Sequence, residues 1–95
     1  MTELLNNTVY LFAKKVCPQC FPMRALVEQS LQGSTVLTLN ELEAEEPNLE
    51  LCADLGVDRT PAVVIKVNTE LIGPLYEPVE VAEAIKHAKN IARRA

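Results

Sequence analysis

The feature that most constrains this chain is a pair of cysteines, Cys17 and Cys20, with Pro18 and Gln19 between them. An apolar, β-branched and aromatic run, TVYLFAK at residues 8–14, comes just before the pair and predicts a buried strand. Apolar residues at helical spacing follow the pair. The cysteines are therefore expected where a strand leads into a helix. The pair can be interpreted as a redox dithiol, as two ligands of a metal ion, or as two thiols of the core.

The remaining sequence predicts a series of short elements. They are a helix from the cysteines to Gly33, a strand at 34–40, a helix from Pro47 to Leu55, strands at 62–67 and 70–75, and a helix from Pro78 onward. Asn68-Thr69 is expected to form a tight hairpin turn between the last two strands. The acidic segment at residues 41–46 is expected to be a solvated loop.

This order, β-α-β-α-β-β-α, predicts an α/β fold with a four-stranded mixed sheet and three helices. Crossover helices join parallel strands, whereas a two-residue turn joins antiparallel ones. At 95 residues the chain is expected to form one domain, residues 1–95.

Composition narrows the classes of function. Hydrophobic residues make up 48% of the chain and charged residues 23%, which is typical of a globular protein rather than a disordered one. The net charge of −4 argues against nucleic acid as a partner, because phosphate binding needs a basic surface. No apolar run approaches the ~20 residues of a membrane span, and the N-terminus lacks the features of a signal peptide. A soluble, monomeric, cytoplasmic protein without a structural disulfide framework is expected.

The predicted position of the cysteines suggests how their chemistry would work. With Pro18 in the first helical position, Cys17 is expected at the helix N-terminus, where unpaired N–H groups and the helix dipole favour a thiolate. C-x-x-C motifs in this setting lower a thiol pKa from ~8.5 to ~3.5–7.5. Cys20, three residues later, is expected about 5–6 Å away, within disulfide range. Lys14 and Lys15 would add positive potential.

A second motif is Thr60-Pro61, directly before the predicted strand at 62–67. A proline that opens an interior strand needs a reason, and a cis peptide bond in a tight turn is one. Together, the C-P-x-C motif, this Thr-Pro and the order of elements resemble the thioredoxin superfamily in its small, glutaredoxin-sized form, over essentially the whole chain.

The resemblance implies a thiol–disulfide oxidoreductase that reduces protein disulfides. It implies that Cys17 is the nucleophile, that Cys20 is the resolving thiol and that a cis Pro61 packs against the dithiol, with the Thr60 backbone pairing with bound substrate. The substrate-binding residues are then expected to be Lys14, Pro18, Gln19, Thr60 and Pro61. No bound cofactor and no metal are expected. The expected partners are disulfide-bearing proteins and an upstream reductase.

The reductant is less constrained, because either a thioredoxin reductase or glutathione could supply electrons. Lys14 resembles a lysine that glutaredoxins place before their cysteines. Glutaredoxins, however, carry Gly-Gly and acidic residues where this chain has Ile72-Gly73-Pro74-Leu75-Tyr76, which argues against glutathione. A glutathione-dependent glutaredoxin remains one alternative.

A metal-binding or metal-chaperone module that uses the same C-x-x-C is the other alternative, although a closed zinc site normally needs four ligands. Of the residues outside the motif, Cys52 is expected to be a small core residue and His87 a solvated one. Tyr10, Phe12 and Phe21 are expected to be packing residues rather than ligand contacts, although Phe21 could border the site. Tyr76 is expected to be exposed next to the site.

Overall fold

The computed structural model describes residues 4–94, which form four strands and three helices. In chain order these are β1 (Thr8–Ala13), α1 (Cys20–Leu31), β2 (Thr38–Glu43), α2 (Leu49–Leu55), β3 (Ala62–Val67), β4 (Glu70–Leu75) and α3 (Pro78–Arg94). The predicted order and the predicted fold class are confirmed. Within residues 4–94, none of the helices combines the length and apolar character that crossing a membrane requires.

The four strands form one mixed sheet in the order β2-β1-β3-β4. β1 runs parallel to β2 and antiparallel to β3, and β3 and β4 form the predicted hairpin. The two central strands are almost entirely buried, which explains their continuous apolar sequences. Asn68 has a φ of 51°, a left-handed conformation that asparagine tolerates and that tight hairpin turns require.

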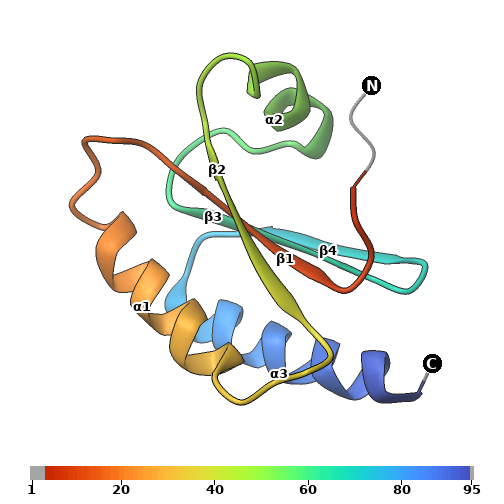
Figure 1. Cartoon of the computed structure of the whole chain (residues 1–95). Coiled ribbons are helices and arrows are strands. Elements are labelled where there is room, and N and C mark those ends of the chain that lie inside the picture. Colours follow the sequence, from red (N-terminus) through yellow and green to blue (C-terminus); the bar gives the residue numbers. More distant parts are fainter. Residues whose placement is uncertain (1–3, 95) are drawn as a thin grey trace.

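Two hydrophobic clusters lie on opposite faces of the sheet, and Figure 1 shows α1 and α3 on one side and α2 on the other. The larger cluster joins β1 and β3 to Val27 of α1 and to Val81 and Ile85 of α3. The smaller cluster joins Phe12 and Val64 to α2. Side chains that alternate along β1 and β3 therefore contribute to the clusters on both faces of the sheet. The helices packed on both faces hold β1 in place, and the cysteine turn follows the end of this strand.

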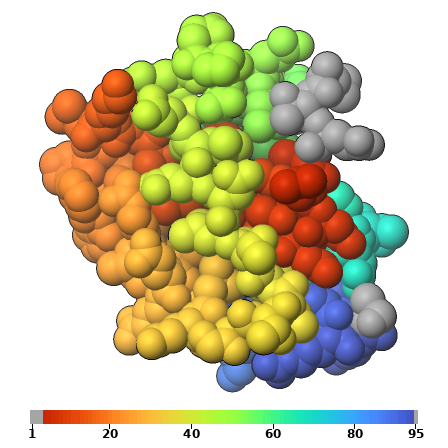
Figure 2. Space-filling view, viewed as in Figure 1, coloured from red at the N-terminus to blue at the C-terminus, as the bar shows by residue number. Residues whose placement is uncertain are grey.

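The prediction for the second strand is wrong in its position. β2 spans Thr38–Glu43 instead of residues 34–40. The Ser34 hydroxyl accepts hydrogen bonds from the N–H groups of Val36 and Leu37, which holds this segment in a turn. Glu41 and Glu43 consequently belong to a strand rather than a loop. They are tolerated because β2 is an edge strand, and Figure 2 shows it exposed across this face of the molecule.

The start of α2 also differs from the prediction. The helix begins at Leu49, and Pro47 lies in the preceding turn, where Asn48 N–H donates to the Glu45 carbonyl. The predicted end of the helix is confirmed, because Gly56 takes a left-handed conformation with φ 78° directly after Leu55.

Candidate functional site

Cys17 and Cys20 are joined by a disulfide bond, with an Sγ–Sγ distance of 2.08 Å and Cα atoms 5.3 Å apart. They close a tight turn rather than sharing a helical face. Cys20 N–H donates to the Cys17 carbonyl at 3.0 Å, and α1 begins only at Cys20. The prediction that Pro18 occupies the first helical position is therefore wrong. Pro18 instead follows Cys17 in a β-turn, a position that its fixed φ favours.

The two cysteines differ sharply in exposure. Cys20 is only 2% exposed, whereas Cys17 is half-buried and lies among the exposed residues of the loop. Two exposed apolar side chains flank the turn, Val16 at 91% and Phe21 at 66% exposure. An attacking reagent would therefore reach Cys17 and not Cys20. Exposure therefore distinguishes the two thiols.

A charged hollow of about 270 Å³ opens on one side of the disulfide. Its lining combines both cysteines, apolar side chains, three cations and two carboxylates, namely Ala13, Lys14, Lys15, Cys17, Cys20, Phe21, Arg24, Glu41, Leu42 and Glu43. The β1–α1 loop, α1 and β2 each contribute to it. Lys14 and Lys15 supply the positive potential near the cysteines that was expected from the sequence.

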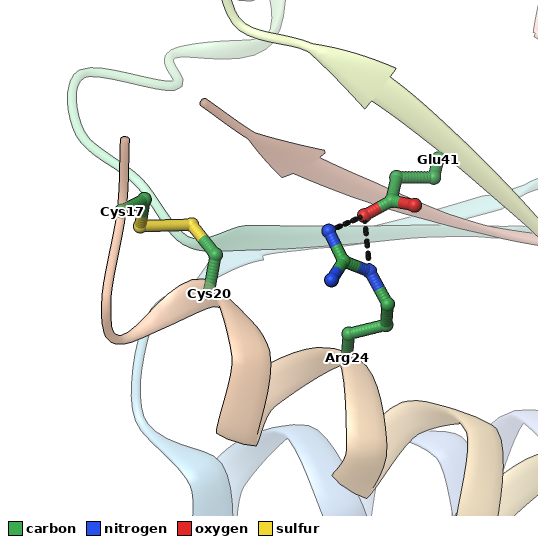
Figure 3. Close-up of a disulfide and its surroundings, with 4 residues drawn as sticks. All are labelled: Cys17, Cys20, Arg24 and Glu41. Atoms are coloured by element: carbon green, nitrogen blue, oxygen red, sulfur yellow. Dashed lines mark hydrogen bonds and ion pairs between the residues drawn. A yellow bond between two sulfur atoms is a disulfide. The ribbon is translucent and has the colours of Figure 1, made fainter. Parts of the chain in front are cut away.

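Arg24 and Glu41 form an ion pair in this hollow, shown beside the disulfide in Figure 3. The guanidinium donates to one Glu41 oxygen from Nε at 2.6 Å and from Nη2 at 2.5 Å. This hydrogen bonding raises the pKa of Arg24 above its ordinary value, so the side chain stays charged. The pair ties the first turns of α1 to the edge strand.

A more apolar hollow of about 340 Å³ is lined by Gln19 of the cysteine turn together with Pro22, Met23, Pro61, Tyr76, Glu77 and Pro78. The predicted cis Thr60–Pro61 bond is confirmed, and Pro61 is buried directly before β3. Pro61 and Gln19 thus share one cavity although they are far apart in the sequence. The cysteine turn lies between a charged hollow and an apolar one.

The other predicted substrate-binding residues lie near the turn. Lys14 is exposed and lines the charged hollow, as well as a smaller cavity of about 140 Å³ that it shares with half-buried Thr60. Pro18 and Gln19 are exposed within the turn itself. Their predicted roles in substrate binding stay predictions.

Most residues outside the motif lie in the environments that were expected. Cys52 is a free thiol at 5% exposure in the smaller core cluster, and His87 is exposed on α3. Tyr10 and Phe12 are buried, and half-buried Tyr76 borders the apolar hollow. The prediction that Phe21 is a packing residue is wrong, because its side chain is exposed and borders the charged hollow. Among residues 4–94, no three His, Cys, Asp or Glu side chains lie together in a way that could hold a metal ion.

Burial raises the pKa of the Cys52 thiol above its ordinary value, so less thiolate forms at a given pH. In the reduced native protein at pH 8, we expect iodoacetamide to modify Cys17 first and to leave Cys52 unmodified until denaturant is added. Peptide mass spectrometry over time would measure the order. Equal rates at Cys17 and Cys52 would show that the small cavity beside Cys52 admits the reagent.

Arg24 and the contribution of Glu41 to the hollow were not predicted from the sequence. Arg24 stands one helical turn after Cys20, so its i,i+4 spacing could have placed it on the same side of the helix. Glu41 could not have been found in the same way, because the second strand was predicted to end at Asn40.

Comparison with solved structures identifies similar folds at low sequence identity. Mitochondrial thioredoxin 3 from Saccharomyces cerevisiae superimposes with a TM-score of 0.74 and 20% identity, covering 86% of this chain and 79% of the other. Thioredoxin 1 from Thermosipho africanus gives 0.66 and 17%, covering 90% and 98%. Desulfothioredoxin from Desulfovibrio vulgaris Hildenborough gives 0.65 and 22%, covering 88% and 82%.

No protein-family model and no curated protein sequence matches the chain. The structural similarity therefore rests on the arrangement of the backbone, with the four-stranded sheet, the three helices and the cysteine turn after β1. On these grounds the chain has the thioredoxin fold.

Proposed function

We propose that this protein is a thiol–disulfide oxidoreductase that reduces disulfides in other proteins. The observation that carries the proposal is the Cys17–Cys20 disulfide, which joins an accessible sulfur to a buried one at the start of α1. Thiol–disulfide exchange needs two unequal thiols, one that attacks and one that resolves the intermediate. The accessible Cys17 suits the first role and the buried Cys20 the second.

The reaction begins from the reduced dithiol. The Cys17 thiolate attacks one sulfur of the substrate disulfide, forms a mixed disulfide with it and releases the other substrate sulfur as a thiolate. The Cys20 thiolate then attacks Cys17 Sγ, which re-forms the Cys17–Cys20 bond and releases the second substrate thiolate. Two electrons pass to the substrate, and an external dithiol reductant must return two electrons to the protein.

Protein substrates are favoured by the surface around the turn. Val16 and Phe21 expose apolar side chains there, and the apolar hollow adjoins Gln19. Exposed apolar groups rimmed by charge are typical of protein-binding surfaces. Lys14 and Lys15 on the opposite side would favour acidic groups near the substrate disulfide.

Glutathione is proposed to be a poor ligand. Beyond Gly73, Pro74 has no N–H group and Leu75 has no polar side chain, whereas an anionic tripeptide requires hydrogen-bond donors. We therefore expect electrons to arrive through a thioredoxin-reductase-type enzyme rather than through glutathione.

Two coupled assays run in parallel test this proposal. In one, thioredoxin reductase and NADPH drive insulin reduction. In the other, glutathione and its reductase drive the reduction of a small glutathione mixed disulfide. We expect turnover in the first assay and little in the second. The reverse result would make the protein a glutathione-dependent glutaredoxin, and inactivity in both, with zinc or copper bound by the dithiol, would favour the metal-binding alternative.

A further inference from the structure

Tyr76, directly after β4, holds the loop that leads into β3. Its hydroxyl accepts a hydrogen bond from Asp58 N–H at 3.3 Å and lies 3.4 Å from the Gly56 carbonyl, to which it donates. The Arg59 guanidinium carbon lies 4.0 Å from the centre of the same ring, within the range of a cation–π interaction. Contacts at Gly56, Asp58 and Arg59 thus fasten residues 56–59 to one side chain.

The next two residues of this loop, Thr60 and Pro61, lie beyond the paired part of the sheet. Pairing of β3 with β1 ends at Ala62, opposite Phe12, and pairing with β4 ends at Val63, opposite Leu75. The ladder therefore does not fix the Thr60 peptide. Its position depends on the loop before it, and hence on Tyr76.

Tyr76 also lines the apolar hollow together with Pro61 and Gln19. The Tyr76 side chain consequently forms part of the wall of this hollow. Through its contacts with the preceding loop, it also positions the Thr60–Pro61 segment opposite the cysteine turn. A substrate segment bound there would lie between Gln19 of the cysteine turn and Pro61, directly after Thr60.

We propose that Tyr76 is a positioning residue for protein substrates, acting through the residue 56–60 loop on the Thr60–Pro61 segment. This inference rests on the proposed oxidoreductase function. Tyr76 does not touch the reacting sulfurs in this role. Loosening the loop weakens substrate binding, because the free protein must then order the segment on association.

Tyr76→Phe is the sharpest test, because it removes the two hydroxyl contacts and keeps the ring beneath Arg59. We expect the KM for insulin to rise about threefold to tenfold with kcat nearly unchanged, the size that the loss of a hydrogen bond predicts. The pH profile of Cys17 alkylation should keep its midpoint, because the change does not reach the thiolate.

The other tyrosine supplies a matched control. The Tyr10 hydroxyl also accepts a hydrogen bond from a backbone N–H, that of Leu5 at 2.6 Å, but in a different part of the chain. Tyr10→Phe should leave KM unchanged. Arg59→Gln, at an exposed position, should raise KM about twofold to fivefold through loss of the cation–π contact.

The possible results distinguish the positioning role of Tyr76 from the proposed oxidoreductase function. An inactive wild-type protein would overturn both. An active wild type with an unchanged KM in Tyr76→Phe and Arg59→Gln would overturn the positioning role alone. Equal KM changes in Tyr76→Phe and Tyr10→Phe would also overturn it, because a general loss of stability would then explain the result.

Discussion

Replacing Cys17 with serine is expected to reduce insulin reduction to the uncatalysed background, the largest effect on activity of any single substitution. A serine hydroxyl does not ionise near neutral pH, so no thiolate remains at the accessible position to attack the substrate disulfide. Cys20 cannot take over, because only 2% of its surface is exposed. Turbidity from the reduced insulin chains, followed with dithiothreitol or a reductase as electron source, measures the loss.

Cys20→Ser has a different expected outcome, which assigns the two roles. Cys17 can still attack, but no neighbouring thiol can release the product, so the mixed disulfide accumulates. Non-reducing electrophoresis and mass spectrometry would show a covalent adduct of protein and substrate in Cys20→Ser and none in Cys17→Ser. An adduct formed by Cys17→Ser instead would reverse the assignment of attacker and resolver.

Cys52→Ala is the control for both variants. Cys52 lies in the smaller core cluster and is not part of the disulfide, so its removal is expected to cost some stability and to leave insulin reduction intact. Loss of activity in this variant, with the fold retained, would show that Cys52 takes part in the reaction, which the proposed mechanism does not include.

Much of the fold could be predicted because its signals are local. The continuous apolar sequence of residues 62–67, the turn at Asn68 and the helical spacing after Pro78 each identify one element with clear ends. These patterns depend on neighbouring residues alone. The cis Thr60–Pro61 bond was only one possible interpretation of the local sequence, and the resemblance to the thioredoxin superfamily implied it.

The errors arose where hydrogen bonding or strand pairing overrides the strand preference of the side chains. Thr35, Val36 and Leu37 have β-branched or apolar side chains, yet the Ser34 hydroxyl holds them in a turn. The strand passes instead through Glu41 and Glu43. A strand with two carboxylates is stable here because β1 pairs with it along its whole length. The cysteine turn was similarly missed, because a proline suits a β-turn and a first helical turn equally well.

Contacts between distant segments were the least predictable part of the site. Arg24 meets Glu41 only because α1 packs beside β2, and Tyr76 meets Gly56 and Asp58 only because β4 ends beside the loop before β3. No spacing in the sequence predicts these contacts. They depend on which strands pair and in which register, whereas the pattern of apolar residues shows only which face of a strand is buried.

The register of β4 rests on Gly73, and Gly73→Ala is expected to have a large effect on stability. The pairing of β3 and β4 shifts between Val63 and Ile65, at a place where Gly73 has a φ of 111°. A Cβ atom there would lie 2.6 Å from the Val63 carbonyl oxygen, a backbone atom inside the sheet. β3 cannot move aside easily, because Val63 is fully buried and β3 pairs with β1 on its other side.

We expect Gly73→Ala to lower the free energy of unfolding by ~3 kcal/mol, combining the strain of a positive φ with the steric clash. Gly33→Ala is the matched control. Gly33 also has a positive φ, 77°, but nothing lies within 4 Å of its would-be Cβ, so only the conformational cost of ~1 kcal/mol applies. Urea unfolding of the oxidised proteins, followed by circular dichroism, would compare them. Equal decreases in the free energy of unfolding in the two variants would contradict this prediction. They would show that the irregularity in β4 accommodates a methyl group and that the close approach of Gly73 to Val63 does not fix the register.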